Sequence, residues 1–146
     1  MSMGMYCSFV SDDDNKPIRF KIENVTTPLG ISDYSGKKSV LINLTEEIQI
    51  LNEVHEQACK RFPSYNLENP HKKSEKYGLQ IKCNLNQLTL LFDEAKDMIE
   101  DPNEFEKHSV VSLVGEVSTV WSKSNKNGGI SLRLCQMKKS KTGLIP

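Results

Sequence analysis

The sequence predicts a mostly β domain of the α+β kind, a small five-stranded Greek-key barrel with two connecting helices. Three observations support this fold class. The last forty residues contain two segments rich in β-branched residues around a loop of turn formers, which is typical of a hairpin. Three earlier segments alternate apolar and polar residues, as half-buried strands do. Two segments repeat apolar residues every three or four positions, as amphipathic helices do.

The 146 residues suffice for one domain that buries about two-thirds of its unfolded surface. We expect residues 17–138 to form this domain, between a flexible leader at residues 1–16 and a basic flexible tail at residues 139–146. No apolar run is long enough to span a membrane, and no secretory signal is recognisable. The four cysteines are scattered without a CxxC pair, which favours reduced thiols in an intracellular, reducing compartment.

The first half of the domain reads as two strands followed by a helix. Ile18, Phe20 and Ile22 alternate with charged residues, and residues 39–44 alternate in the same way. Thr45 is a natural N-cap for a helix that Pro63 ends.

The second half reads as a strand, a helix and the hairpin. Residues 77–83 alternate as a third strand, and Asn86 is placed to cap a second helix that ends at Pro102. The apolar stripe of that helix would be Leu88, Leu91, Phe92, Ala95, Met98 and Ile99.

The hairpin joins residues 110–121 to residues 130–137. The loop between them is too long for a two-residue turn, so we expect it to project as a mobile finger. No strand is followed by a glycine-rich phosphate loop, which argues against a dinucleotide-binding sheet. Five strands and two helices fit the OB barrel best, a fold that binds oligonucleotides on a sheet face flanked by loops.

The net charge of zero conceals a separation of charge along the chain. Residues 107–146 carry seven Lys or Arg and one Glu (+6), whereas residues 84–106 carry seven Asp or Glu and one Lys (−6). Residues 16–38 and residues 71–82 are each +3, from five bases against two acids and four against one. The separation indicates a bipolar surface; the ordinary alternative is that each element is solvated by its own charges.

No residue pattern indicates catalysis or a bound metal. His55, His71 and His108 have no HxxxH, HExxH or CxxC neighbour, and no nucleophile motif is present. The carboxylates of the expected second helix alternate with its apolar stripe and fit a solvated face. We therefore expect no enzyme activity, no cofactor and no metal.

Lysines next to aromatic residues indicate a surface for single-stranded nucleic acid, which needs cations for phosphates and rings for stacked bases. Trp121 stands at the base of the expected finger. Arg133 alternates out of phase with its apolar neighbours and should leave the core face. The ordinary alternatives are a core tryptophan and solubilising lysines. The candidate binding residues are Arg19, Lys21, Tyr34, Lys37, Lys38, Lys72, Lys73, Lys76, Tyr77, Trp121, Lys123, Lys126, Arg133, Lys138 and Lys139.

The hairpin carries the run Val114-Gly115-Glu116-Val117, then Trp121, Gly128-Gly129 and the strand at residues 130–137. This pattern resembles the closing hairpin of OB-fold single-stranded DNA-binding proteins from large DNA viruses and phages. The resemblance implies coating of exposed strands during replication, recombination or repair, in the cytoplasm or nucleus of a host cell or in a virion. Many such proteins end in an acidic tail that recruits partners, whereas this sequence ends in Lys141-Thr142-Gly143-Leu144-Ile145-Pro146, so tail-mediated recruitment is in doubt.

We therefore expect non-catalytic binding of single-stranded DNA with little sequence preference. RNA stays open as a ligand, because discrimination depends on contacts to the 2′-hydroxyl. The alternative is a structural or assembly protein, for example a small virion component, that docks a protein partner. An exposed edge strand could also pair with its twin in a homo-oligomer.

Overall fold

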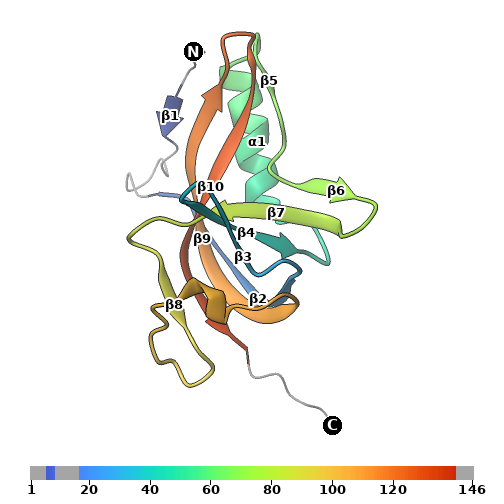
Figure 1. Cartoon of the computed structure of the whole chain (residues 1–146). Coiled ribbons are helices and arrows are strands. Elements are labelled where there is room, and N and C mark those ends of the chain that lie inside the picture. Colours follow the sequence, from blue (N-terminus) through green and yellow to red (C-terminus); the bar gives the residue numbers. More distant parts are fainter. Residues whose placement is uncertain (1–5, 9–16, 141–146) are drawn as a thin grey trace.

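The computed structural model describes residues 6–8 and 17–140. Its longest elements are β9 (Ser109–Ser122) and β10 (Asn127–Lys139), which pair antiparallel from end to end as the sequence predicts. Two register shifts interrupt the pairing, between Ser131 and Leu132 and between Leu134 and Gln136. Such bulges increase the local twist and let long strands bend around a core. Figure 1 shows both strands running the length of the molecule.

Five strands form a ring around the core. β9 pairs with β2 (Arg19–Thr27), which meets β4 (Lys37–Asn43) at one residue pair. β4 pairs with β7 (Gly78–Asn84), and β7 returns to β10 in a short parallel step. The closing steps β2–β4 and β7–β10 are short, so the ring is barrel-like without being a continuous barrel. The mostly β prediction with five main strands is thus confirmed.

Shorter strands extend the ring at its margins. They are β1 (Tyr6–Ser8) on β9, β3 (Ile31–Tyr34) on β4, β5 (Asn66–Leu67) and β8 (Leu90–Phe92) on β10, and β6 (Lys72–Ser74) on β7. β1 falls within the predicted leader, whose other residues lie outside the described part of the chain. Of the predicted tail, Lys139 belongs to β10, and residues 141–146 lie outside the described part.

α1 (Gln49–Arg61) connects β4 to β5 and buries Leu51, Val54 and Ala58. The predicted N-cap, Thr45, is wrong: the N-cap residue is Ile48, and no side chain of its own caps the helix. The Ile48 N–H instead donates to Nε2 of His71, 2.8 Å away. A histidine from a later segment therefore satisfies one of the amides that a helix start leaves unpaired.

The predicted second helix is wrong, and residues 86–101 form turns around β8 instead. The Asn86 side chain accepts the Leu88 N–H at 2.9 Å, and Asp93 accepts the N–H groups of Ala95 and Asp97 at 2.9 Å each. Such local side-chain hydrogen bonds compete with helix formation. β8 then pairs with β10 at Leu90–Phe92 and so gains a tertiary partner that the isolated helix would lack.

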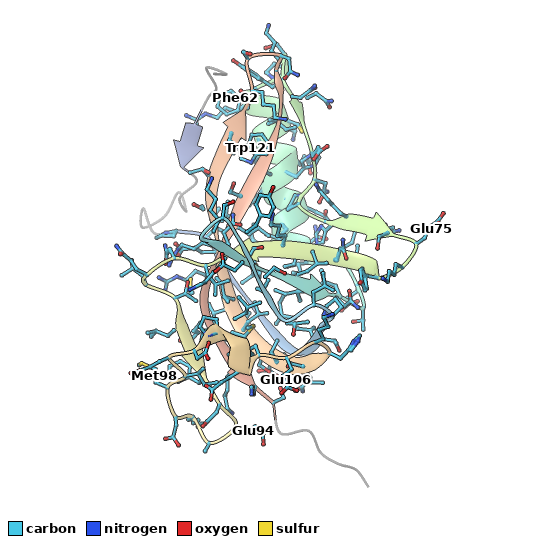
Figure 2. The ribbon with its side chains drawn as sticks, viewed as in Figure 1. Phe62, Glu75, Glu94, Met98, Glu106 and Trp121 are labelled. Carbon is cyan, nitrogen blue, oxygen red and sulfur yellow. The ribbon has the colours of Figure 1, made fainter. Side chains whose placement is uncertain are left out.

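The apolar stripe of that expected helix does not form one buried face. Leu91 and Ile99 are buried, but Leu88 is 69 % exposed and Met98 is 62 % exposed. Figure 2 shows Met98 at the margin of the molecule. Although its apolar residues recur every three or four positions, this segment does not form a helix that packs on the ring.

The hairpin loop is shorter than predicted and does not form a free finger. The strands extend to Ser122 and Asn127, which leaves a four-residue turn, and Lys126 in that turn has a φ of 69°. β5 supports the hairpin tip, because the Asn66 N–H donates to the Lys126 carbonyl at 2.8 Å. The close approach of the strands requires Gly128, where a Cβ would collide with the carbonyl of Trp121.

Two further expectations concern membranes and thiols. No helix in the described part of the chain is long and apolar enough to cross a membrane. Cys59, Cys83 and Cys135 are free cysteines.

Candidate nucleic-acid interface

The outer face of β4, β7 and β10 carries a hollow of about 350 Å³. Alternation decides which side chains reach it, because Ile81 and Cys83 of β7 enter the core and their neighbours point outward. The segment around β5 and β6 forms one wall. The residues that line the hollow are Leu41, Glu68, Asn69, Pro70, Lys72, Gln80, Ile81, Lys82, Asn84, Trp121, Gly129, Ile130, Ser131 and Leu132.

Trp121 supplies an aromatic surface to this hollow. It is half-buried near the end of β9, opposite Gly129 of β10. A Cβ on Gly129 would lie 3.5 Å from Cζ2 of the indole, so the ring lies against the bare backbone of that glycine. Figure 2 shows Trp121 beside the β9–β10 hairpin. The ring lines the hollow and is absent from the buried core.

Two lysines bring positive charge to the hollow. Lys72 was a candidate from the sequence, and it forms an exposed ion pair with Glu68 at 3.4 Å. Lys82 was missed, although its place between the buried Ile81 and Cys83 in an alternating strand was a usable signal. Its register partner on β4 is Leu41, which adds an apolar patch beside the cation.

Polar side chains complete the hollow with hydrogen-bonding groups. Gln80, Asn84 and Ser131 line it from β7 and β10. The Oε1 atom of Gln80 is buried and makes no hydrogen bond within the described residues. A buried carbonyl oxygen without a donor is costly, so this amide is a strained polar group beneath the hollow.

A second hollow, of about 310 Å³, lies beyond the first on the side of the β3–β4 hairpin. Lys38, another sequence candidate, lines it together with Asn86 and Gln87, over an apolar floor that includes Leu91 and Ile99. Glu100 also lines this hollow, so its charge is mixed.

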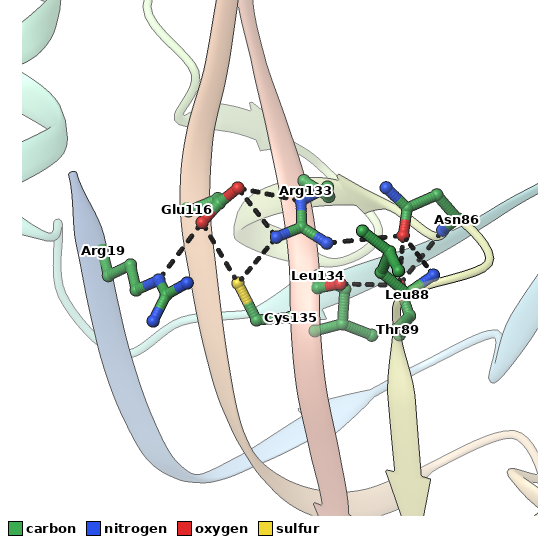
Figure 3. Close-up of polar contacts among 8 residues, drawn as sticks. All are labelled: Arg19, Asn86, Leu88, Thr89, Glu116, Arg133, Leu134 and Cys135. Carbon is green, nitrogen blue, oxygen red and sulfur yellow. Dashed lines mark hydrogen bonds and ion pairs between the residues drawn. The ribbon is translucent and has the colours of Figure 1, made fainter. Parts of the chain in front are cut away.

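A row of polar side chains crosses β2, β9 and β10 (Figure 3). Arg19 of β2, Glu116 of β9 and Arg133 of β10 are register partners on neighbouring strands. The Arg133 Nε and Nη2 groups donate to Glu116 Oε1 at 2.9 and 2.8 Å, and the Arg19 Nε donates to Oε2 at 3.2 Å. Arg133 is also the register partner of Asn84 in the first hollow, and its Nη1 donates to Asn86 of the second at 3.3 Å.

The electrostatics of this row favour an ionised carboxylate. Burial alone raises the pKa of Glu116, but hydrogen bonds from Arg133 and then Arg19 outweigh burial and hold the pKa below its usual value. Cys135 donates from Sγ to Glu116 at 3.5 Å. Burial and the adjacent carboxylate raise the pKa of the Cys135 thiol, which makes it a poor nucleophile.

Several other candidates lie on the two hairpins that project from the ring. Tyr34, 83 % exposed, and Lys37 are partners across the β3–β4 turn. Lys73, Lys76 and Tyr77 belong to the β6–β7 hairpin, where Lys76 Nζ lies 5.3 Å from the centre of the Tyr77 ring. Figure 1 shows this hairpin extending sideways, with Glu75 at its tip in Figure 2.

The remaining cations do not gather around either hollow. Lys123 and Lys126 lie at the hairpin tip, whereas Lys138 and Lys139 lie at the opposite end of β10, about 40 Å along the strand. Lys126 Nζ is 6.0 Å from the Tyr65 ring, and Lys139 Nζ is 5.5 Å from the Phe105 ring. Lys21 pairs with Glu23 on the surface of β2 at 3.2 Å. The candidates thus form several separate positive patches.

The described residues contain no group of three His, Cys, Asp or Glu side chains arranged to hold a metal ion. A five-stranded ring with one helix and an open outer face of cations, amides and an aromatic ring belongs to the OB-like class of folds.

Solved structures place this fold among those of phage single-stranded DNA-binding proteins. The C-terminally truncated single-stranded DNA-binding protein of bacteriophage Enc34 is similar over 86 % of this chain and 87 % of its own, at 20 % identity and a TM-score of 0.60. The same protein in complex with single-stranded DNA covers 86 % and 88 %, at 19 % identity and a TM-score of 0.61. The single-stranded DNA-binding protein gp2.5 of bacteriophage T7 covers 89 % and 90 %, at 11 % identity and a TM-score of 0.54.

No protein-family model matches the sequence, and no curated protein matches it. The resemblance drawn from the C-terminal hairpin is confirmed at the level of the fold, and it extends over most of the chain.

Proposed function

We propose that this protein binds single-stranded DNA, without catalysis and with little sequence preference. The hollow on β4, β7 and β10 is the primary site. A base stacks on Trp121, and the backbone phosphates pass Lys72 and Lys82. The observation that carries the proposal is this hollow, in which an accessible indole and two lysines meet on the outer face of the ring.

The fold supports the same function. Similar folds belong to two phage proteins named for binding single-stranded DNA, one of them solved with that ligand. The free cysteines Cys59, Cys83 and Cys135 agree with a reducing compartment, where exposed strands arise during replication and repair.

Fluorescence anisotropy with a labelled oligo-dT tests the proposal directly. If Lys72 and Lys82 engage phosphates, the logarithm of affinity should fall against the logarithm of salt concentration with a slope of about −1.4, and each further engaged cation should add about −0.7. The W121A variant should bind more weakly by about 1–3 kcal/mol, because one stacked base is lost. K82A should bind more weakly and show a shallower salt slope, by about 0.7.

The matched control is K60A, which removes an equally exposed lysine from α1, where Lys60 pairs with Glu56 at 3.2 Å. K60A should leave both affinity and slope unchanged. Binding that is micromolar or weaker and indifferent to salt would remove the proposed function. A titration with oligo-U in parallel measures any preference for DNA over RNA.

A second candidate function, a structural or assembly role through protein contacts, has one observation in its favour. Leu88, Leu90 and Met98 are exposed around β8, on the segment whose net charge is −6. Exposed apolar side chains on an acidic segment suit a protein partner better than a polyanion. This role predicts no nucleic acid after low-salt purification and a stable oligomer in sedimentation velocity, whereas the proposed function predicts a raised ratio of absorbance at 260 to 280 nm.

A further inference from the structure

Arg133 was predicted to bind phosphate, but its N–H groups already contact other side chains of the protein. Its side chain is 19 % exposed. Nε and Nη2 contact Glu116, Nη2 also contacts Cys135 at 3.5 Å, and Nη1 contacts Asn86. A guanidinium binds phosphate best through two parallel N–H groups. Arg133 has no free pair of such groups while it stays on Glu116.

Glu116 lies where its negative charge acts directly on two arginines, Arg19 and Arg133. Its side chain is 11 % exposed and lies between the Arg19 and Arg133 side chains of the neighbouring strands. The carboxylate is ionised at neutral pH, because the two guanidinium groups lower its pKa. An anion held between Arg19 and Arg133 occupies the position that a backbone phosphate would take between them.

The negative charge of Glu116 lowers the net positive charge of the row formed by Arg19, Glu116 and Arg133. Two arginines and one glutamate present a net charge of +1 instead of +2 beside Asn84 of the first hollow and Asn86 of the second. The Glu116 carboxylate contacts Arg19, Arg133 and Cys135, and a neutral amide of the same shape would fit the same position. The charge of Glu116 is therefore not required by packing alone.

We propose that Glu116 is an internal counter-anion. It holds Arg133 away from the nucleic acid and so limits the affinity of the protein for single-stranded DNA. This inference rests on the proposed binding of single-stranded DNA. Arg133 is then a latent phosphate ligand, held in reserve by its own chain. The affinity for single-stranded DNA is then lower than it would be if Arg133 were free to bind a phosphate.

Anisotropy titrations of wild type, E116Q and E116Q/R133Q with the same labelled oligo-dT test this inference. Arg19 is 61 % exposed and already accessible in the wild type, so Arg133 is the cation that E116Q adds. E116Q should bind about fivefold more tightly near 0.1 M salt, as expected for one added charge contact close to water. Its salt slope should be steeper by about 0.7, for one additional phosphate. E116Q/R133Q has the net charge of wild type and should return both affinity and slope to the wild-type values.

The matched control is E56Q, which makes the same charge change in the exposed Glu56–Lys60 pair on α1 and should leave binding unchanged. Circular dichroism and thermal melts establish that each variant is folded. If E116Q fails to fold, E116T takes its place with the same expected results, because its neutral β-branched side chain suits a strand and also removes the carboxylate from Arg133.

Two results would overturn the inference while the proposed function stands. One is a folded E116Q variant that binds no more tightly than wild type. The other is a double variant that binds several-fold more weakly, which would make Arg133 a phosphate ligand already in the wild type. Failure of the wild type itself to bind oligo-dT removes the proposed function, and the inference with it.

Discussion

The histidine at the start of α1 should make stability depend on pH. His71 is 8 % exposed, and its Nε2 accepts the Ile48 N–H at 2.8 Å. Its other ring nitrogen, Nδ1, lies 2.9 Å from Asn69 Oδ1 and therefore carries the proton as a donor. Protonation of Nε2 would remove the acceptor and place two donors against each other. The neutral imidazole is thus the form that the fold requires.

The direction of the pH dependence follows from the pKa. Burial lowers the pKa of His71 below its usual 6.5, and nearby Glu47 opposes this in part. The unfolded chain then binds a proton at higher pH than the folded chain does. The stabilisation is fully present above about pH 6.5 and is lost as pH falls through the folded pKa. One proton gives a slope of at most about 1.4 kcal/mol per pH unit in that window.

Urea unfolding at several pH values from 7.5 to 5 measures this effect, with H71Q as the comparison. H71Q should be less stable than wild type at pH 7.5 by about 1–3 kcal/mol, because the Ile48 N–H loses a well-placed acceptor. The deficit should shrink toward pH 5, since glutamine does not titrate and the other histidines are present in both proteins. Parallel pH profiles for the two proteins would refute the assignment of a neutral, buried His71.

Two further predictions concern the core. G115A should lower the free energy of unfolding by about 1–3 kcal/mol, because an added Cβ would lie 2.5 Å from Cζ of Phe20; a thermal melt unchanged from wild type would contradict this close packing. Cys83 should resist a thiol reagent at pH 8 in the native protein and react once urea is added, since burial raises its pKa to about 12. Cys59, which is partly exposed, serves as the internal reference in peptide mapping. Equal labelling of both cysteines in the native protein would refute the burial of Cys83.

Much of the fold could be predicted from local patterns. The alternation of Ile18, Phe20 and Ile22, and the β-branched run before Trp121, depend on side chains within one strand. The first helix ends before Pro63 as predicted. The second helix was predicted wrongly because its apolar spacing was compatible with a helix, whereas the local turns of Asn86 and Asp93 and the pairing of β8 with β10 oppose one.

The types of residue in the candidate site could be predicted from the sequence, but the particular residues could not. Trp121 and Lys72 lie in the first hollow, and Lys38 lies in the second. Lys82 was overlooked beside more conspicuous clusters of lysine. Lys138 and Lys139 carry as much charge as any candidate, yet the length of β10 separates them from the hairpin tip.

The sequence by itself determined which residues alternate, which segments favour strands, and that positive charge and aromatic rings occur together. These properties depend on neighbours a few positions apart, so a linear reading captures them. Only the tertiary structure decided that Glu116 meets Arg19, 97 residues earlier, and Arg133, 17 residues later. Strand pairing and register bring such residues together, and both are selected by the burial of the whole core, which no local pattern encodes.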